Sequence, residues 1–256
     1  MPLTGSFKTL LLRGLLAGLI AGLLAATVGY FIGEPHIEAA IAIEEAGSGG
    51  HSHGTVEDQA HDEEPLVSRS GQQAGQFLAL ALAGMAFGAI FAAVVNTARR
   101  FTTLSGPRLS LIAASLAWVA IVVVPFFKYP ANPPAVGDPE TIDQRTWLWV
   151  AVVVLGLLAV AAAVAAYRVL AGQLDSFRLI AAVAAFVLVT TAGYVLLPGV
   201  NEVSDDFPAT LLWQFRVASL AETATLWAAL GLAFAALTEW SSARSTPVAR
   251  EVATSG

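Results

Sequence analysis

Six long runs of apolar residues, separated by segments rich in proline, glycine and charge, set the pattern of this chain. Each run holds about twenty residues, the length that a helix needs to cross roughly 30 Å of hydrocarbon. The runs are continuously apolar and do not alternate, so they predict helices and not strands. They cover residues 10–32, 77–95, 109–127, 147–167, 179–197 and 217–237. The pattern predicts an all-α, polytopic membrane helix bundle with six transmembrane helices.

The first run also has features of a secretory signal. Lys8 and Arg13 give it a basic start, and Ala40 and Ala42 resemble a cleavage site. Its apolar stretch is longer than the hydrophobic region of a signal peptide, which holds about 7–15 residues. We therefore expect a retained transmembrane helix.

Composition agrees with a membrane protein and excludes several classes of function. Of the 256 residues, 56% are hydrophobic and only 12% are charged, whereas soluble domains have about 25% charged residues. The absence of cysteine excludes disulfides and thiolate metal sites. The motifs G-x-x-x-x-G-K-S/T, H-E-x-x-H and G-x-S-x-G are absent, as is a basic stripe for nucleic acid. We expect no enzyme activity, no tightly bound cofactor and no nucleic-acid partner.

The distribution of lysine and arginine predicts the orientation in the membrane. With the N-terminus inside, nine of the 13 cations fall on inside segments, as the positive-inside rule expects. Both termini are then cytoplasmic, whereas five spans would place Arg244 and Arg250 outside. We predict a single transmembrane domain over residues 1–240, an acidic outside loop over 33–76 and a short disordered tail over 241–256.

The predicted outside loop holds all four histidines of the chain, together with many acids. Imidazole binds first-row metals such as Co²⁺, Ni²⁺ and Zn²⁺, and carboxylates add oxygen ligands. A Gly/Ser-rich tether would let this loop collect a cation at the membrane surface. The alternative is a solvated, disordered loop with no metal role. The candidate metal ligands here are Glu34, His36, His51, His53 and His61.

A stiff, proline-rich segment follows the third run. Five prolines stand between Pro125 and Pro139, and each fixes φ and removes a backbone donor. Asp138 and Glu140 are candidate metal ligands in this segment. It forms either a lid that positions these carboxylates for a cation or a structural clasp between helices. Three outside cations lie within or beside polar motifs, and we assign them to ion pairing or gating: Lys128, Arg145 and Arg216.

A second polar segment leads into the last run. Asn201, Glu202, Asp205 and Asp206 offer a compact set of oxygen ligands. Glu222 is the only acid inside a predicted span, and intramembrane ionisable residues are costly and usually functional. We expect Glu222 to face the bundle interior as a metal ligand on a transport pathway. The alternative is that it pairs with Arg216 or reaches toward the outer surface.

Three parts of the chain resemble the CbtA family of predicted cobalt transporter subunits. The resemblance lies in Phe127–Ile142 (FKYPANPPAVGDPETI), in Asp206–Leu220 (DFPATLLWQFRVASL) with Asn201-Glu202-Val203 before it, and in Gly33-Glu34-Pro35. It implies a multi-pass protein of the bacterial cytoplasmic (inner) membrane, in a cobalt uptake system linked to cobalamin synthesis. It also implies Co²⁺ or a similar divalent cation as substrate, and a small single-span, histidine-containing partner of the CbtB type.

Two functions remain open on these grounds. The chain is either a subunit of a metal transport system or a non-transporting membrane scaffold or metal-binding regulatory subunit. A polar path across the membrane would favour transport. The outer half offers Asp138, Glu202, Asp206 and Glu222, but the inner half offers little beyond Asn96 and Thr97. The oligomeric state is left open.

Overall fold

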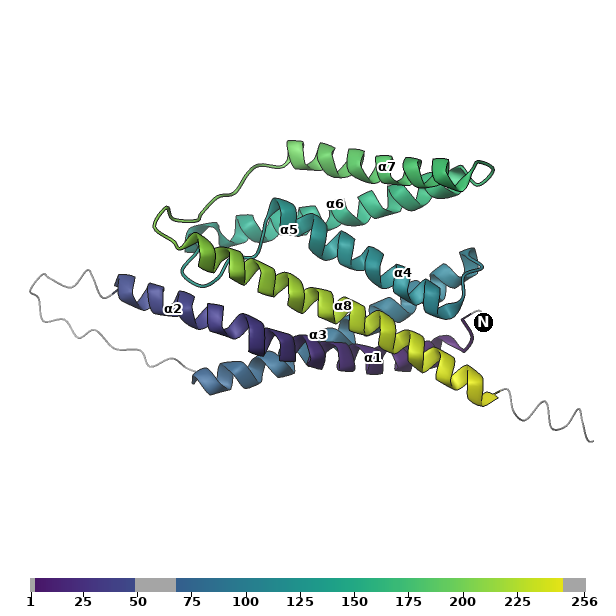
Figure 1. Cartoon of the computed structure of the whole chain (residues 1–256), viewed down its shortest axis with the longest axis horizontal. Helices are drawn as coiled ribbons and strands as arrows, with labels where there is room; N and C mark the ends of the chain where they lie inside the picture. The colour runs from purple at the N-terminus through teal and green to yellow at the C-terminus, as the bar shows by residue number, and fades with distance from the viewer. Residues whose placement is uncertain (1–2, 49–67, 246–256) are drawn as a thin grey trace, which may run out of the picture. The chain divides into compact units, whose positions relative to one another are not determined.

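The computed structural model describes residues 3–48 and 68–245, and the only regular elements in these ranges are helices (Figure 1). Six helical segments are long and apolar enough to cross a membrane, which confirms the predicted six-span, all-α fold. They are Phe7–Ala46, Arg69–Phe101, Gly106–Lys128, Pro139–Val169, Asp175–Leu196 and Ala209–Ser241. The cytoplasmic position of both termini stays a prediction.

The helices have the following bounds. They are α1 (Phe7–Val28), the π-helical turn η1 (Gly29–Gly33), α2 (Glu34–Ser48), α3 (Arg69–Ala98), η3 (Arg99–Phe101), α4 (Gly106–Trp118), the π-helical turn η4 (Val119–Val123), α5 (Val124–Lys128), η5 (Pro139–Thr141), α6 (Ile142–Val169), α7 (Asp175–Leu196) and α8 (Ala209–Ser245).

The described residues form two compact units. The first unit falls within Met1–Ala113, Pro133–Ala135 and Val217–Gly256, and the second within Ala114–Asn132 and Val136–Arg216. The first therefore contains α1, α3 and most of α8, and the second contains α6 and α7. The single transmembrane domain over residues 1–240 stays a prediction.

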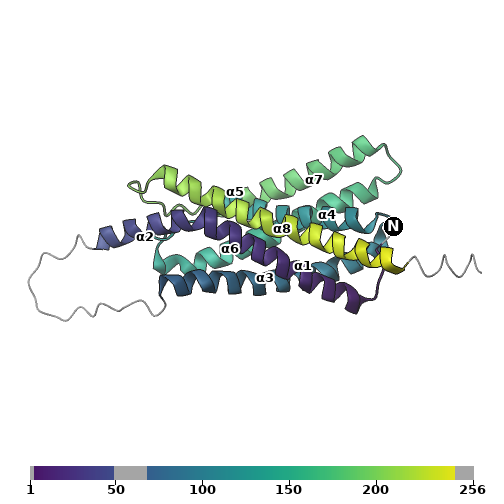
Figure 2. The same ribbon diagram turned by 60° about the horizontal axis from the view of Figure 1, so that its bottom comes forward.

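In the first unit, α1 and α3 lie side by side with their backbones in contact (Figures 1 and 2). A Cβ atom added to Gly18 would overlap the carbonyl oxygen of Gly84, and one added to Gly14 would overlap that of Gly88. Gly22 approaches the carbonyl of Leu80 in the same way. Small residues at every fourth position allow this close approach, which gives helices in lipid the dispersion contacts that hold them together.

Both π-helical turns stand two residues before a proline inside a span. Pro35 has no N–H, and its ring would clash with the carbonyl of the residue four positions earlier in a regular α-helix. The turn widens there, and the N–H of Glu34 donates to the carbonyl of Gly29, five residues back. Before Pro125, the N–H of Val124 likewise donates to the carbonyl of Val119. The helix thus continues past each proline instead of ending.

The predicted loop over 33–76 is wrong at both of its ends. The first helix continues through η1 into α2 as far as Ser48, and α3 already begins at Arg69. The segment after Pro35 is rich in Ala, Glu and Ile, and Ala and Glu are strong helix formers, so nothing ends the helix near the predicted membrane surface. The predicted tail over 241–256 likewise begins late, because α8 runs to Ser245.

In the second unit, α6 and α7 form a helical hairpin (Figure 1). Arg178 closes its short connection. Its guanidinium lies 3.9 Å from the centre of the Tyr167 ring and donates to the carbonyl of Tyr167. Gly156 of α6 lies against the backbone of Ala120 in η4, with no room for a Cβ atom between them.

Candidate functional site

A polar stripe lies at the start of α3, ahead of its apolar run. Arg69, Gln73 and Gln76 follow at steps of four and three residues, so they share one face of the helix. We call these three residues the α3 stripe. Ser68 caps the helix by accepting a hydrogen bond from the N–H of Gly71, which fixes where the helix begins.

Glu34, the first residue of α2, contacts the N-terminal end of the α3 stripe. It is only 6% exposed. Arg69 Nη2 forms an ion pair with Glu34 Oε1, and Gln73 Nε2 donates to the same oxygen over 2.9 Å. A carboxylate removed from water needs such partners, because an uncompensated buried charge is strongly destabilising. The stripe therefore supplies the positive charge and the amide that compensate the Glu34 carboxylate inside the unit.

Glu222 of α8 and the other end of the stripe, Gln76, both lie against Gly29 in η1. A Cβ atom placed on Gly29 would lie 2.5 Å from Gln76 Nε2 and 2.7 Å from Glu222 Oε2. The carboxylate and the amide therefore occupy the space that the missing side chain of Gly29 leaves free. Glu222 is half-buried. The predicted inward position of its side chain is consistent with this contact, but its role in metal binding stays a prediction.

The carboxylates of Glu34 and Glu222 stand at different levels along the helices. Gly29, beside Glu222, precedes Glu34 by five residues, which is about 7–8 Å of helix. Between these levels the α3 stripe supplies two amide side chains. Arg69, Glu34, Gln73, Gln76 and Glu222 thus follow one another as a file of polar side chains from the start of α3 into the spans, which we call the polar file.

At the far end of α3 the structure offers one buried polar group. Asn96 is 8% exposed, and its Oδ1 has no hydrogen-bond partner among the residues described. The neighbouring Thr97 is exposed and donates to the carbonyl of Ala93. Asn96 follows Gln76 by twenty residues, or about 30 Å of helix. The predicted scarcity of polar groups in the inner half therefore applies to α3.

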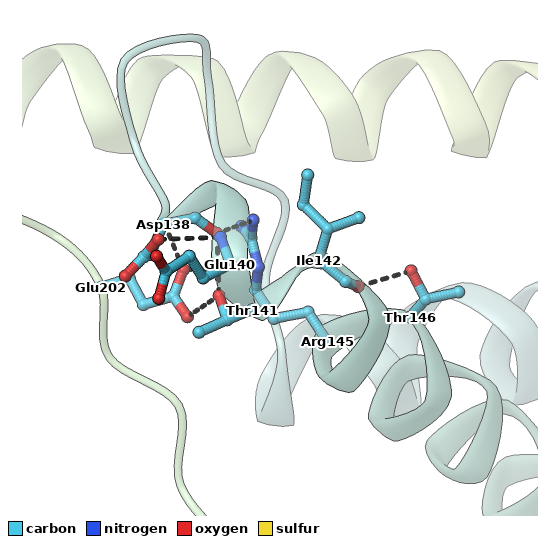
Figure 3. A network of polar contacts seen from close by, with 7 residues as sticks. All are labelled: Asp138, Glu140, Thr141, Ile142, Arg145, Thr146 and Glu202. Atoms are coloured by element: carbon cyan, nitrogen blue, oxygen red, sulfur yellow. Dashed lines mark hydrogen bonds and ion pairs between the residues drawn. The ribbon is translucent and has the colours of Figure 1, made fainter.

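In the second unit, the polar residues of the proline-rich segment form a closed network with Glu202 (Figure 3). Glu202 accepts hydrogen bonds from Thr141 Oγ1 at 2.6 Å and from the N–H of Asp138 at 2.9 Å. Its Oε2 also lies 3.3 Å from Arg145 Nε. Arg145 Nη2 donates to the carbonyl of Asp138. We call Asp138, Thr141, Arg145 and Glu202 the Glu202 clasp.

The clasp stabilises the ionised form of Glu202. The hydrogen bond from Thr141, the backbone N–H of Asp138 and the charge of Arg145 hold the pKa of Glu202 below its ordinary value. Gly137 makes room for this arrangement. Its φ of +120° lies in the region that favours glycine, and a Cβ atom there would overlap the guanidinium of Arg145. Of the two interpretations of this segment, the contacts favour a structural clasp.

The other two predicted gating cations also bind backbone oxygens. Lys128 Nζ donates to the carbonyls of Tyr194 and Leu197 at 2.9 and 2.8 Å, at the C-terminal end of α7. Cations stabilise this end of a helix, where carbonyls lack intrahelical partners. Arg216 donates to the carbonyl of Ala131 and to Asn132 Oδ1. These contacts describe structural anchors, and a gating role stays a prediction.

Of the remaining predicted ligands, Glu140 adjoins the Glu202 clasp, since its backbone N–H donates to Asp138 Oδ1 over 2.9 Å (Figure 3). His51, His53 and His61 lie outside the described residues. His36 is half-buried on α2, and Asp205 and Asp206 are exposed before α8. Glu140 and Asn201 are also exposed. In residues 3–48 and 68–245, no three His, Cys, Asp or Glu side chains lie close enough to hold a metal ion together. The proposed metal roles of these residues stay predictions.

The sequence-based prediction did not include three residues of the polar file, Arg69, Gln73 and Gln76, or Gly29, which makes room beside it. Arg69 and the two glutamines lie within residues 33–76, for which the sequence predicts a loop. The available signal was the step of four and three residues between Arg69, Gln73 and Gln76, which is a helical period placed directly before an apolar run.

Comparison with known proteins gives one match. The model of a family described as "Probable cobalt transporter subunit (CbtA)" matches residues 7–239, nearly the whole chain. No curated protein and no solved structure matches significantly.

Proposed function

The chain belongs to the CbtA family of probable cobalt transporter subunits, and we propose that its α1, α3 and α8 helices carry Co²⁺ or a similar divalent cation along the polar file. Glu222 is the cation ligand within the membrane, and Gln76 supplies a second oxygen beside it. No catalytic chemistry is needed for this role.

The observation that carries this proposal is the position of Glu222 at Gly29. An ionisable residue in a span is costly, so it is rare where it has no function. Here a glycine leaves space for the carboxylate, and the neighbouring side chain is an amide that can also bind a cation through oxygen. A site with few ligands suits transport, because an ion must leave as readily as it enters.

In this proposal, the chain transports the cation only together with a partner subunit. The family description names a subunit, and Asn96 is the only buried polar residue on the second half of α3. A small single-span, histidine-containing subunit of the CbtB type would supply ligands for the inner half. The setting would be the bacterial cytoplasmic membrane and the cobalt supply for cobalamin synthesis.

The test is Co²⁺ uptake by cells that express the chain with its small partner, comparing Glu222→Gln with the wild type. We expect the loss of this carboxylate to reduce uptake at least about tenfold at normal protein abundance, since a good charge–ligand contact is worth more than about 1.4 kcal/mol. Glu239→Gln is the matched control, because it removes an exposed carboxylate from the same helix. Equal uptake by both variants and the wild type would reject transport through Glu222 and favour the scaffold function.

A further inference from the structure

We propose that Arg69 is a tethered competitor for a cation site on Glu34, and that a divalent cation enters the polar file by displacing it. This inference rests on the proposed function and extends it to the step before Glu222. The site consists of the Glu34 carboxylate with the amide of Gln73, and its ligand class is a hydrated divalent metal ion.

The form of the ion pair is the first argument. Arg69 Nη2 and Gln73 Nε2 both contact the same oxygen of Glu34, Oε1. Nη1 of Arg69 is turned toward Gln72 instead, donating to its Oε1 over 2.8 Å. Nε of Arg69 has no hydrogen-bond partner among the described residues. The pair thus lacks the two parallel bonds that make arginine–carboxylate pairs strong.

The contrast in exposure is the second argument. The Glu34 side chain is 8% exposed, whereas the Arg69 side chain is 36% exposed. The carboxylate is therefore fixed within the unit, while the guanidinium, whose Nε and Nη2 are covered, gains hydration when it leaves toward water. A cation that replaces Arg69 would keep Glu34 compensated throughout the exchange, which a buried carboxylate requires.

The place of the pair along the helices is the third argument. Gln73 contacts Glu34, and Gln76, one turn further along the same face, lies beside Glu222. An ion bound at Glu34 would therefore meet amide oxygens on its way to the second carboxylate. An ion pair whose only role was to hold α2 against α3 would not need to lie in line with Gln76 and Glu222.

The competing account is a structural fastening, and it makes a different kinetic prediction. If Arg69 occupies Glu34 most of the time, the apparent affinity for the cation falls in proportion to the free fraction of sites. Removing the guanidinium then lowers KM. A fastening would lower protein abundance and leave KM as it is.

The experiment measures Co²⁺ uptake against concentration in cells that express the full chain and its partner, with protein level followed in parallel. We expect Arg69→Gln to lower KM by about tenfold, which corresponds to a site about 90% occupied by Arg69. Arg100→Gln, which removes an exposed charge at the other end of the same helical segment, should leave KM unchanged. The double variant Glu34→Gln/Arg69→Gln should not have the lowered KM of Arg69→Gln.

Three results would overturn the inference: an unchanged or higher KM in Arg69→Gln, a gain that persists without Glu34, or an equal gain in Arg100→Gln. If Arg69→Gln does not accumulate, Arg69→Lys decides. This variant keeps the charge on a shorter side chain, so its KM should lie between that of the wild type and the tenfold lower value expected for Arg69→Gln. A KM equal to that of the wild type would reject competition. If Glu222→Gln abolishes uptake while Arg69 variants keep their KM, only this inference fails. If Glu222→Gln has no effect, the proposed function fails.

Discussion

The two π-helical turns arise from the same local cause and have different neighbours. Both η1 and η4 stand two residues before a proline within a span. At η1, Gly29 is covered by the ends of two flexible polar side chains, Gln76 and Glu222. At η4, the backbone of Ala120 lies directly against Gly156 of α6, and no side chain separates them. The proline determines where a helix widens, but the neighbours determine whether the widened turn serves a polar site or helix packing.

Glu202 in the second unit and Glu222 in the first differ in how much of their bonding capacity is already used. Glu202 is held by two hydrogen bonds and an arginine outside the spans, so its bonding capacity is largely used. Glu222 lies in a spanning helix, and no hydrogen bond or ion pair to it is present among the residues described. Charge that is already satisfied stabilises a loop, and charge left open within a span is available to a ligand.

The largest effect should come from filling the packing contact at η4. A Cβ atom on Gly156 would overlap the backbone of Ala120, and backbone cannot move aside as a side chain can. We expect Gly156→Ala to destabilise the protein by about 1–3 kcal/mol, as overpacking does, and Gly156→Leu to prevent its accumulation. Melting temperature in detergent and membrane abundance measure this. Gly75→Ala is the control, because no atom lies within 4 Å of its added Cβ.

A smaller and different effect should follow at η1. In Gly29→Ala the new Cβ meets only the movable ends of Gln76 and Glu222, so the fold should persist while the site is rearranged. We expect Co²⁺ uptake to fall by about tenfold, equivalent to about 1.4 kcal/mol of lost binding, at normal abundance. Gly33→Ala in the same turn has open space around its Cβ and should transport normally. Equal loss in both variants would show that the turn itself, and not the carboxylate, is sensitive.

The smallest effect concerns the Glu202 clasp and its dependence on pH. Because the pKa of Glu202 is lowered in the folded protein, its contribution to stability is complete above the ordinary value of 4.5 and disappears as the pH falls through the lowered pKa. Glu202→Gln should therefore lower the melting temperature at pH 7, and this difference from the wild type should shrink below about pH 4. The KM for Co²⁺ should stay the same in the variant. A changed KM would place the clasp in the transport pathway.

The spans were predictable because the bilayer imposes a simple rule. A run of about twenty apolar residues is almost sufficient to define a transmembrane helix, and each predicted run overlaps one observed segment. Helix ends were less predictable, because α2 and the start of α3 are polar enough to leave the bilayer and helical enough to continue. The hydropathy of residues 34–48 carries no signal for the difference between a helix and a loop.

The site was predictable only in part. Glu222 stands out because it is an acid in an apolar run, and Glu34 was selected as a candidate ligand. Their neighbours depend on which faces of α1, α3 and α8 meet, and this register is set by Gly14, Gly18 and Gly84, whose contacts cannot be derived from one helix at a time. The function of Arg145 was undecided for a similar reason, since its partner Glu202 is 57 residues away in the chain.

The backbone contact between α1 and α3 also bears on how the protein is made. Of the six spans described, these two are synthesised before the other four, and their contact includes glycines packed directly on backbone carbonyls, with no side chain to order there. Because so little conformational entropy is lost when such surfaces meet, the pair can dock as soon as the second span is inserted. Nascent chains would then carry a finished helical pair before α4 is synthesised, and α8, which brings Glu222 to this pair, would arrive last.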